Sequence, residues 1–148
     1  MTDAQRKADK EAFAKSIHHI LMHVVLADKM WLAKFAGQGV AFVTLHSRLI
    51  ALPEGADYLS NQHPDWEDLK QTRERLEAAM EVWLQAMSHE NLSGTMRYTT
   101  TKGIQRAHTA WQALTHFFHH LARHRGRMAT LLIQPGVDVG IADPIALV

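Results

Sequence analysis

The chain contains no cysteine. This absence excludes disulfide bonds, metal sites built from thiolates, and a nucleophilic thiol supplied by the protein itself. Any bound metal ion must therefore be held by nitrogen or oxygen atoms.

The sequence also lacks an excess of charge of either sign. Its 16 lysine and arginine residues nearly balance its 15 aspartate and glutamate residues, so the formal net charge is +1. No basic run with interleaved aromatic residues occurs. We therefore expect no nucleic-acid partner.

Long hydrophobic runs are missing as well. The first seven residues are mostly polar, unlike a signal peptide, and every apolar run is interrupted before the roughly 20 residues that span a membrane. We expect a cytoplasmic protein with no membrane partner. With 148 residues, 47% of them hydrophobic, the chain predicts one domain over residues 1–148.

The chain is rich in histidine. It contains 11 histidines, and eight of them form two groups. The early group is His18, His19 and His23, and the late group is His108, His116, His119, His120 and His124. Within the late group, His116, His120 and His124 are spaced four apart, so a helix would hold them on one side. The alternative is a solvated histidine-rich face that titrates near pH ~6.5 and does no chemistry.

Apolar periodicity predicts a first long helix over about residues 16–35, nearly buried all round, with Ser16 as its N-cap and Gly37 at its end. Residues 38–63 predict an irregular connection with one short helix. A second long helix is expected to begin near Pro64 and to carry a seam that only Arg73 interrupts. The seam consists of Trp66, Leu69, Leu76, Met80, Trp83 and Met87.

Residues 95–107 predict a small β-hairpin with its turn at Lys102 and Gly103. A capping-box pattern at Thr109 then predicts the last helix, which runs to about Ile133, and residues 137–148 form a C-terminal tail. Its predicted main apolar stripe is Trp111, Leu114, Phe118, Leu121, Ala122, Ala129 and Leu132. His124 lies beside that stripe and His120 on its rim, while His119, Arg123 and Arg127 point to the polar side.

Two histidines one helical turn apart can bind a divalent ion, but a zinc-protease helix also needs a glutamate beside the first histidine, and here it is missing. Spacing alone is therefore a weak signal. His23, on a separate helix with a buried pattern, strengthens it, because three imidazoles with one open position are typical of catalytic zinc.

Residues 16–32, 116–126, 131–132 and 134–138 resemble the DinB/YfiT-like family of small metal-binding helical bundles. The resemblance extends over residues 69–84, the hairpin at 97–103, and Asp143. It implies an all-α helix bundle with a small β-hairpin before the last long helix. The usual first helix of the family is expected to be lacking, since only residues 1–15 precede Ser16. These residues are expected to form either an N-terminal extension of the next helix or a helix remnant.

The resemblance further implies that His23, His120 and His124 bind a divalent metal ion, zinc or nickel, the last two within the motif H-x-x-x-H-R-G. Some members are thiol-dependent transferases or isomerases, and many have no known activity. Two readings stay open. One is a metal-dependent enzyme whose three-histidine site activates a small thiol or water, as a thiol transferase, isomerase or hydrolase acting on a small molecule. The other is a non-catalytic dimeric helical protein with a structural or vacant metal site.

Two charged residues fall where apolar ones are expected. Asp28 lies on the apolar stripe of the first long helix, where it is expected to form a buried ion pair or to serve as a catalytic group. Arg125 lies within the apolar stripe of the last long helix. They could pair with each other, which the sequence leaves open, as it does the roles of His116 and His119. Because the missing helix would leave an apolar face uncovered, we expect a homodimer.

Overall fold

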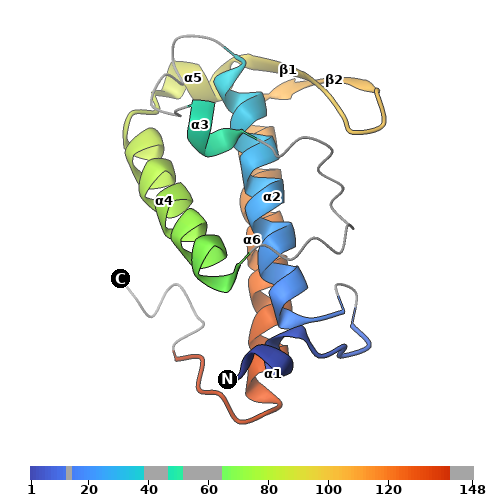
Figure 1. The fold of residues 1–148 in the computed structure, drawn as a ribbon. Helices are drawn as coiled ribbons and strands as arrows, with labels where there is room; N and C mark the ends of the chain where they lie inside the picture. Colours follow the sequence, from blue (N-terminus) through green and yellow to red (C-terminus); the bar gives the residue numbers. More distant parts are fainter. Residues whose placement is uncertain (13–14, 39–46, 52–64, 141–148) are drawn as a thin grey trace.

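Three long helices set the architecture of the computed structural model, which describes residues 1–12, 15–38, 47–51 and 65–140 (Figure 1). They are α2 (Ile17–Ala36), α4 (Trp66–Gln85) and α6 (Ala110–Ile133), and α2 packs against both others. The shorter elements are α1 (Asp3–Lys7), α3 (Ser47–Ile50), α5 (His89–Ser93), β1 (Thr95–Thr99) and β2 (Gln105–Thr109). The described chain is thus mostly helical, with one hairpin directly before the last helix, as predicted, and it is consistent with the expected bundle.

The first long helix begins and ends where the sequence predicts. Ser16 adopts an extended backbone conformation, and its hydroxyl accepts a hydrogen bond from the backbone N–H of His19 at 3.2 Å, which satisfies one of the free donors of the first turn. Gly37 follows the last helical residue. Most positions of α2 are buried, including Ile20, Leu32 and Phe35, so its near-complete burial is confirmed.

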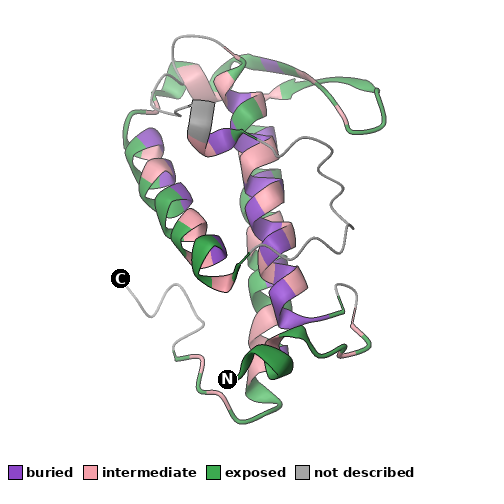
Figure 2. Ribbon diagram, in the orientation of Figure 1, coloured by how far each residue is buried: buried purple, intermediate pink, exposed green. Residues whose placement is uncertain are grey.

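Helix α4 is capped by Asp65, whose carboxylate accepts hydrogen bonds from the N–H groups of Glu67 and Asp68. Pro64, where the helix was expected to begin, lies outside the described residues. The predicted seam faces α2 (Figure 2). Its central members Leu69, Leu76, Met80 and Trp83 are buried, and the end members Trp66 and Met87 are half-buried.

Helix α6 has the predicted limits, and the Gln112 side chain accepts a hydrogen bond from the N–H of Thr109 at 3.1 Å. Its predicted main stripe is only partly buried, because Leu114, Leu121 and Leu132 pack against the core whereas other members are exposed. Trp111 is 52% exposed and Phe118 is 38% exposed, whereas the buried positions are Ala110, Ala113, Phe117, His124 and Leu131. The helix carries apolar residues on two sides, and only one of them is covered. Periodicity cannot tell which side that is.

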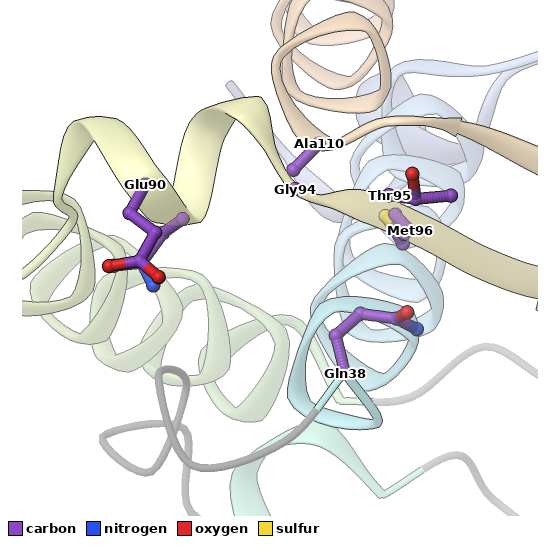
Figure 3. Close-up of a pocket in the computed structure, with 7 residues that line it drawn as sticks. Gln38, Glu90, Gly94, Thr95, Met96 and Ala110 are labelled. Carbon is purple, nitrogen blue, oxygen red and sulfur yellow. The ribbon is translucent and has the colours of Figure 1, made fainter.

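The hairpin is confirmed, with Thr95 opposite Thr109 in antiparallel register and Gly103 in a left-handed conformation at the turn. Gln38, just beyond α2, anchors it, because its amide both donates to the Arg97 carbonyl and accepts from the Arg97 N–H, each at 2.9 Å. Gln38 and the buried Met96 line a cavity of about 280 Å³ beside α5 (Figure 3). Helix α5 was not predicted. Ser88 and Asn91 cap it reciprocally.

The N-terminal segment forms a short helix that is separate from α2. Helix α1 has five residues, capped by Thr2, and contacts the start of α2. The Arg6 guanidinium lies 4.5 Å above the ring of Trp66 and so connects α1 to α4.

The remaining connections are only partly described. Helix α3 is the short helix expected within residues 38–63, most of which, like residues 141–148 with Asp143, lie outside the described chain. Residues 137–140 form neither helix nor strand. None of the described helices combines the length and apolar character that crossing a bilayer requires.

Candidate metal centre

Three histidines from two helices come together. His23 lies on α2, and His120 and His124 lie one turn apart on α6, which packs along α2. One ring nitrogen from each residue lies within 4.8 Å of the other two. The Nε2 atoms of His23 and His120 are 3.3 Å apart. The sequence therefore identified three residues that meet, although 97 positions separate His23 from His120.

Burial keeps these imidazoles neutral. His124 is buried, and His23 and His120 are half-buried. Removal from water disfavours the charged form and is the main cause that lowers the pKa of all three residues, to about 4 for His120 and His124. The neighbouring histidines and Arg127 lower the pKa of His120 and His124 further. At neutral pH each ring therefore has a lone pair available for a metal ion.

The geometry fits one divalent ion. Zinc–nitrogen bonds of about 2.0–2.1 Å in a tetrahedral arrangement place two ligand nitrogens about 3.3 Å apart, which matches the separation between His23 and His120. The Nδ1 atom of His120 is buried without a hydrogen-bond partner among the described residues. No additional aspartate, glutamate or histidine of the described chain joins the group. Imidazole nitrogens are suitable ligands for several divalent transition metals.

The other histidines lie elsewhere. His116, which the helical spacing placed in the same row, is exposed and packs its ring 5.1 Å from that of Trp31. His119 is exposed. His18 is buried and its ring lies 5.5 Å from that of Trp66, which makes it part of the packing between α2 and α4.

Two further histidines of the described chain do not join the group. His108 is exposed, as is His89. His46 and His63 lie outside the described residues. As predicted, His120 and His124 are nearer the interior than His119.

Asp28 has a partner that sequence reasoning missed. Its fully buried carboxylate accepts a hydrogen bond from the Arg73 guanidinium, and Arg73 also bonds Glu77 at 2.7 Å. Burial raises the pKa of Asp28 to about 7, while the charge of Arg73 opposes that rise. The available signal was the lone interruption of the α4 seam by Arg73. Arg125, considered as a partner from the sequence, is exposed on α6.

A cleft of about 600 Å³ lies among the three long helices, and we call it the central cleft. Its lining includes Leu21 and Val24 of α2, Arg73 and Glu77 of α4, and Phe118 and His124 of α6. The side chain of His124 thus belongs both to the histidine group and to the wall of the cleft. A molecule bound there would lie beside a metal ligand. The cavity at the hairpin has none of the three histidines in its lining.

One of three comparisons with known proteins finds a match for this chain. No curated protein and no solved structure matches the chain. The model of the DinB family matches residues 1–147, nearly the whole sequence, and the chain therefore belongs to the DinB family.

Proposed function

We propose that this protein binds one divalent metal ion, zinc or nickel, through His23, His120 and His124, and that it is an enzyme. The proposed reaction class is the activation of a small thiol or of water, as in a thiol transferase, isomerase or hydrolase. The observation that carries the proposal is the approach of three imidazole nitrogens within 4.8 Å in a member of the DinB family.

The residues of this chain supply binding and orientation. Three histidine ligands leave at least one coordination position for an external ligand, and a bound divalent ion lowers the pKa of the water or thiol that occupies it. The thiol must come from a small molecule, since the protein has no cysteine. We place the reaction in the cytoplasm, where small thiols are kept reduced. The central cleft gives the substrate a partly apolar site next to His124.

The test is metal binding by the untagged, metal-stripped protein, titrated with zinc and with nickel. We expect one equivalent to bind, and His120→Gln and His124→Gln each to weaken binding more than about a hundredfold, beyond the usual effect of losing an outer partner of a ligand. His119→Gln, an exposed neighbour, is the matched control. Circular dichroism checks that each variant folds.

The pH dependence provides a second readout. Protons compete with the metal only where the ligands titrate, and burial lowers the pKa of all three histidines, so metal binding should weaken at a lower pH than it would for three exposed imidazoles. Binding of less than about half an equivalent, or unchanged binding in both glutamine variants, would refute the proposal. X-ray absorption showing four protein ligands would instead favour a structural metal site.

A further inference from the structure

Arg125 is a cation in the lining of the central cleft. It lines the cleft directly after His124, and it forms no ion pair with any residue in the part of the chain that the structure describes. The other arginine of the lining, Arg73, is neutralised by its contacts with Asp28 and Glu77. Because Arg73 already contacts two protein carboxylates, Arg125 is the guanidinium of the described lining that is left for a carboxylate on a ligand.

The rest of the lining is mainly apolar. Leu21 and Val24 contribute from α2, and Phe118, Leu121 and Met128 contribute from α6. Phe118, which is 38% exposed, is the aromatic residue of this lining. A volume of about 600 Å³ is within the range of sites for small molecules.

These features select the charge of the ligand as well as its polarity. A guanidinium forms two parallel hydrogen bonds with a carboxylate, which makes arginine well suited to this group. Glu77 lines the same cleft and would repel a ligand with two or more negative charges. A single unpaired cation next to an acid thus favours a monoanion.

We propose that the central cleft binds an apolar molecule carrying one carboxylate, with its hydrocarbon part against Leu21, Phe118 and Met128 and its carboxylate on Arg125. This deepens the proposed function by naming the substrate class. Binding of the molecule requires no metal. Only its later chemical conversion rests on the proposed function. Because His124 lines the same cleft as Arg125, a molecule bound there would lie beside one member of the histidine group.

The experiment uses octanoate as the probe, titrated by calorimetry into the metal-free full chain. We expect octanoate to bind at least about tenfold more tightly than 1-octanol, and Arg125→Gln to weaken octanoate binding about tenfold or more, as is usual for losing a charged hydrogen bond. Arg123→Gln, an exposed arginine outside the cleft lining, should leave it unchanged. Zinc titration of the same three proteins should show equal metal binding.

Three outcomes would overturn the proposal. Octanoate does not bind, or it binds no better than 1-octanol, or Arg125→Gln binds it as well as the unaltered protein. A fourth contrary outcome is conversion of a dimer to a monomer by Arg125→Gln without any effect of octanoate, which would assign the cleft to a second copy of the chain. Failure of zinc binding with normal octanoate binding would remove the proposed function and leave the anion site standing.

Discussion

At the scale of single residues, the burial of Asp28 has the largest energetic consequence. Its carboxylate is fully buried in α2, and its partner Arg73 comes from α4, 45 positions later. Removing one partner of such a pair leaves a buried charge unbalanced, which costs much more than the intact pair contributes to stability. The pair therefore determines how α2 and α4 fit together.

The variant Arg73→Met should destabilise the protein by about 3–5 kcal/mol near pH 8 and by clearly less near pH 5. Burial already raises the pKa of Asp28 to about 7 from its usual 3.8, and loss of Arg73 removes the charge that opposes this rise. The folded variant then holds a proton that the unfolded chain releases, so its stability is present at low pH and is lost as the pH rises through the folded pKa.

Urea unfolding at the two pH values measures this difference. Arg75→Met, at an exposed position of the same helix, is the control and should have little effect at either pH. The double variant Asp28→Asn, Arg73→Met should recover most of the pH-dependent part. Equal losses for Arg73→Met at both pH values would show that packing, not charge, is responsible.

At the scale of elements, the hairpin depends on Gln38. Since β1 pairs with β2 along one edge, the N–H and carbonyl of Arg97 on its other edge need partners, and the Gln38 amide supplies both. A side chain at the end of α2 thus acts as a short piece of a third strand.

Gln38→Ala should release that edge. Two hydrogen bonds of about 1 kcal/mol each are lost, so amide exchange of Arg97 should accelerate by about tenfold or more while the global stability changes little. Hydrogen exchange followed by NMR measures this. Gln105→Ala, which removes a bond to Thr99 at 2.9 Å within the hairpin, is the comparison. Unaltered protection of Arg97 would contradict the anchoring role.

The limits of the helices could be predicted because their caps are local. Ser16 and Gly37 act on the turn next to them, whatever surrounds the helix. The outward face of α6 could not be predicted, because burial depends on which neighbours are present, and both sides of α6 are apolar. The convergence of His23 with His120 and His124 followed from family resemblance, while the partner of Asp28 required the packing of α4 against α2.

At the scale of the whole molecule, α6 leaves an apolar stripe in contact with solvent. Trp111, Phe118, Ala122 and Ile133 are all exposed, and they recur along one side of the helix from its first turn to its last. The exposed Thr115 and Arg125 interrupt this side, and Phe118 and Ala122 line the central cleft, which leaves Trp111 and Ile133 as its exposed apolar residues away from the cleft. We propose that a second copy of the chain packs on this stripe, mainly through positions such as Trp111 and Ile133 that do not line the central cleft.

Sedimentation velocity at micromolar concentration should therefore show a dimer, and Trp111→Glu should convert it to a monomer without changing octanoate binding. Val82→Glu, at a position of α4 that is 56% exposed, is the control. An introduced carboxylate loses its hydrating water only if it lies in the interface between two copies of the chain. Trp111→Glu should therefore disrupt the dimer, and Val82→Glu should not. A monomer for the unaltered chain would exclude this arrangement.

The histidine group can also be regarded as a reversible cross-link in a polymer. His23 and His120 are 97 positions apart, so an ion held between them would close a loop containing α3, α4, α5 and the hairpin. Closing a long loop restricts the unfolded chain more than closing a short one. A chain without disulfides would thus gain, through a metal, the kind of constraint that a disulfide gives. A chelator would remove that constraint, and the helices within the loop would be the first to lose stability.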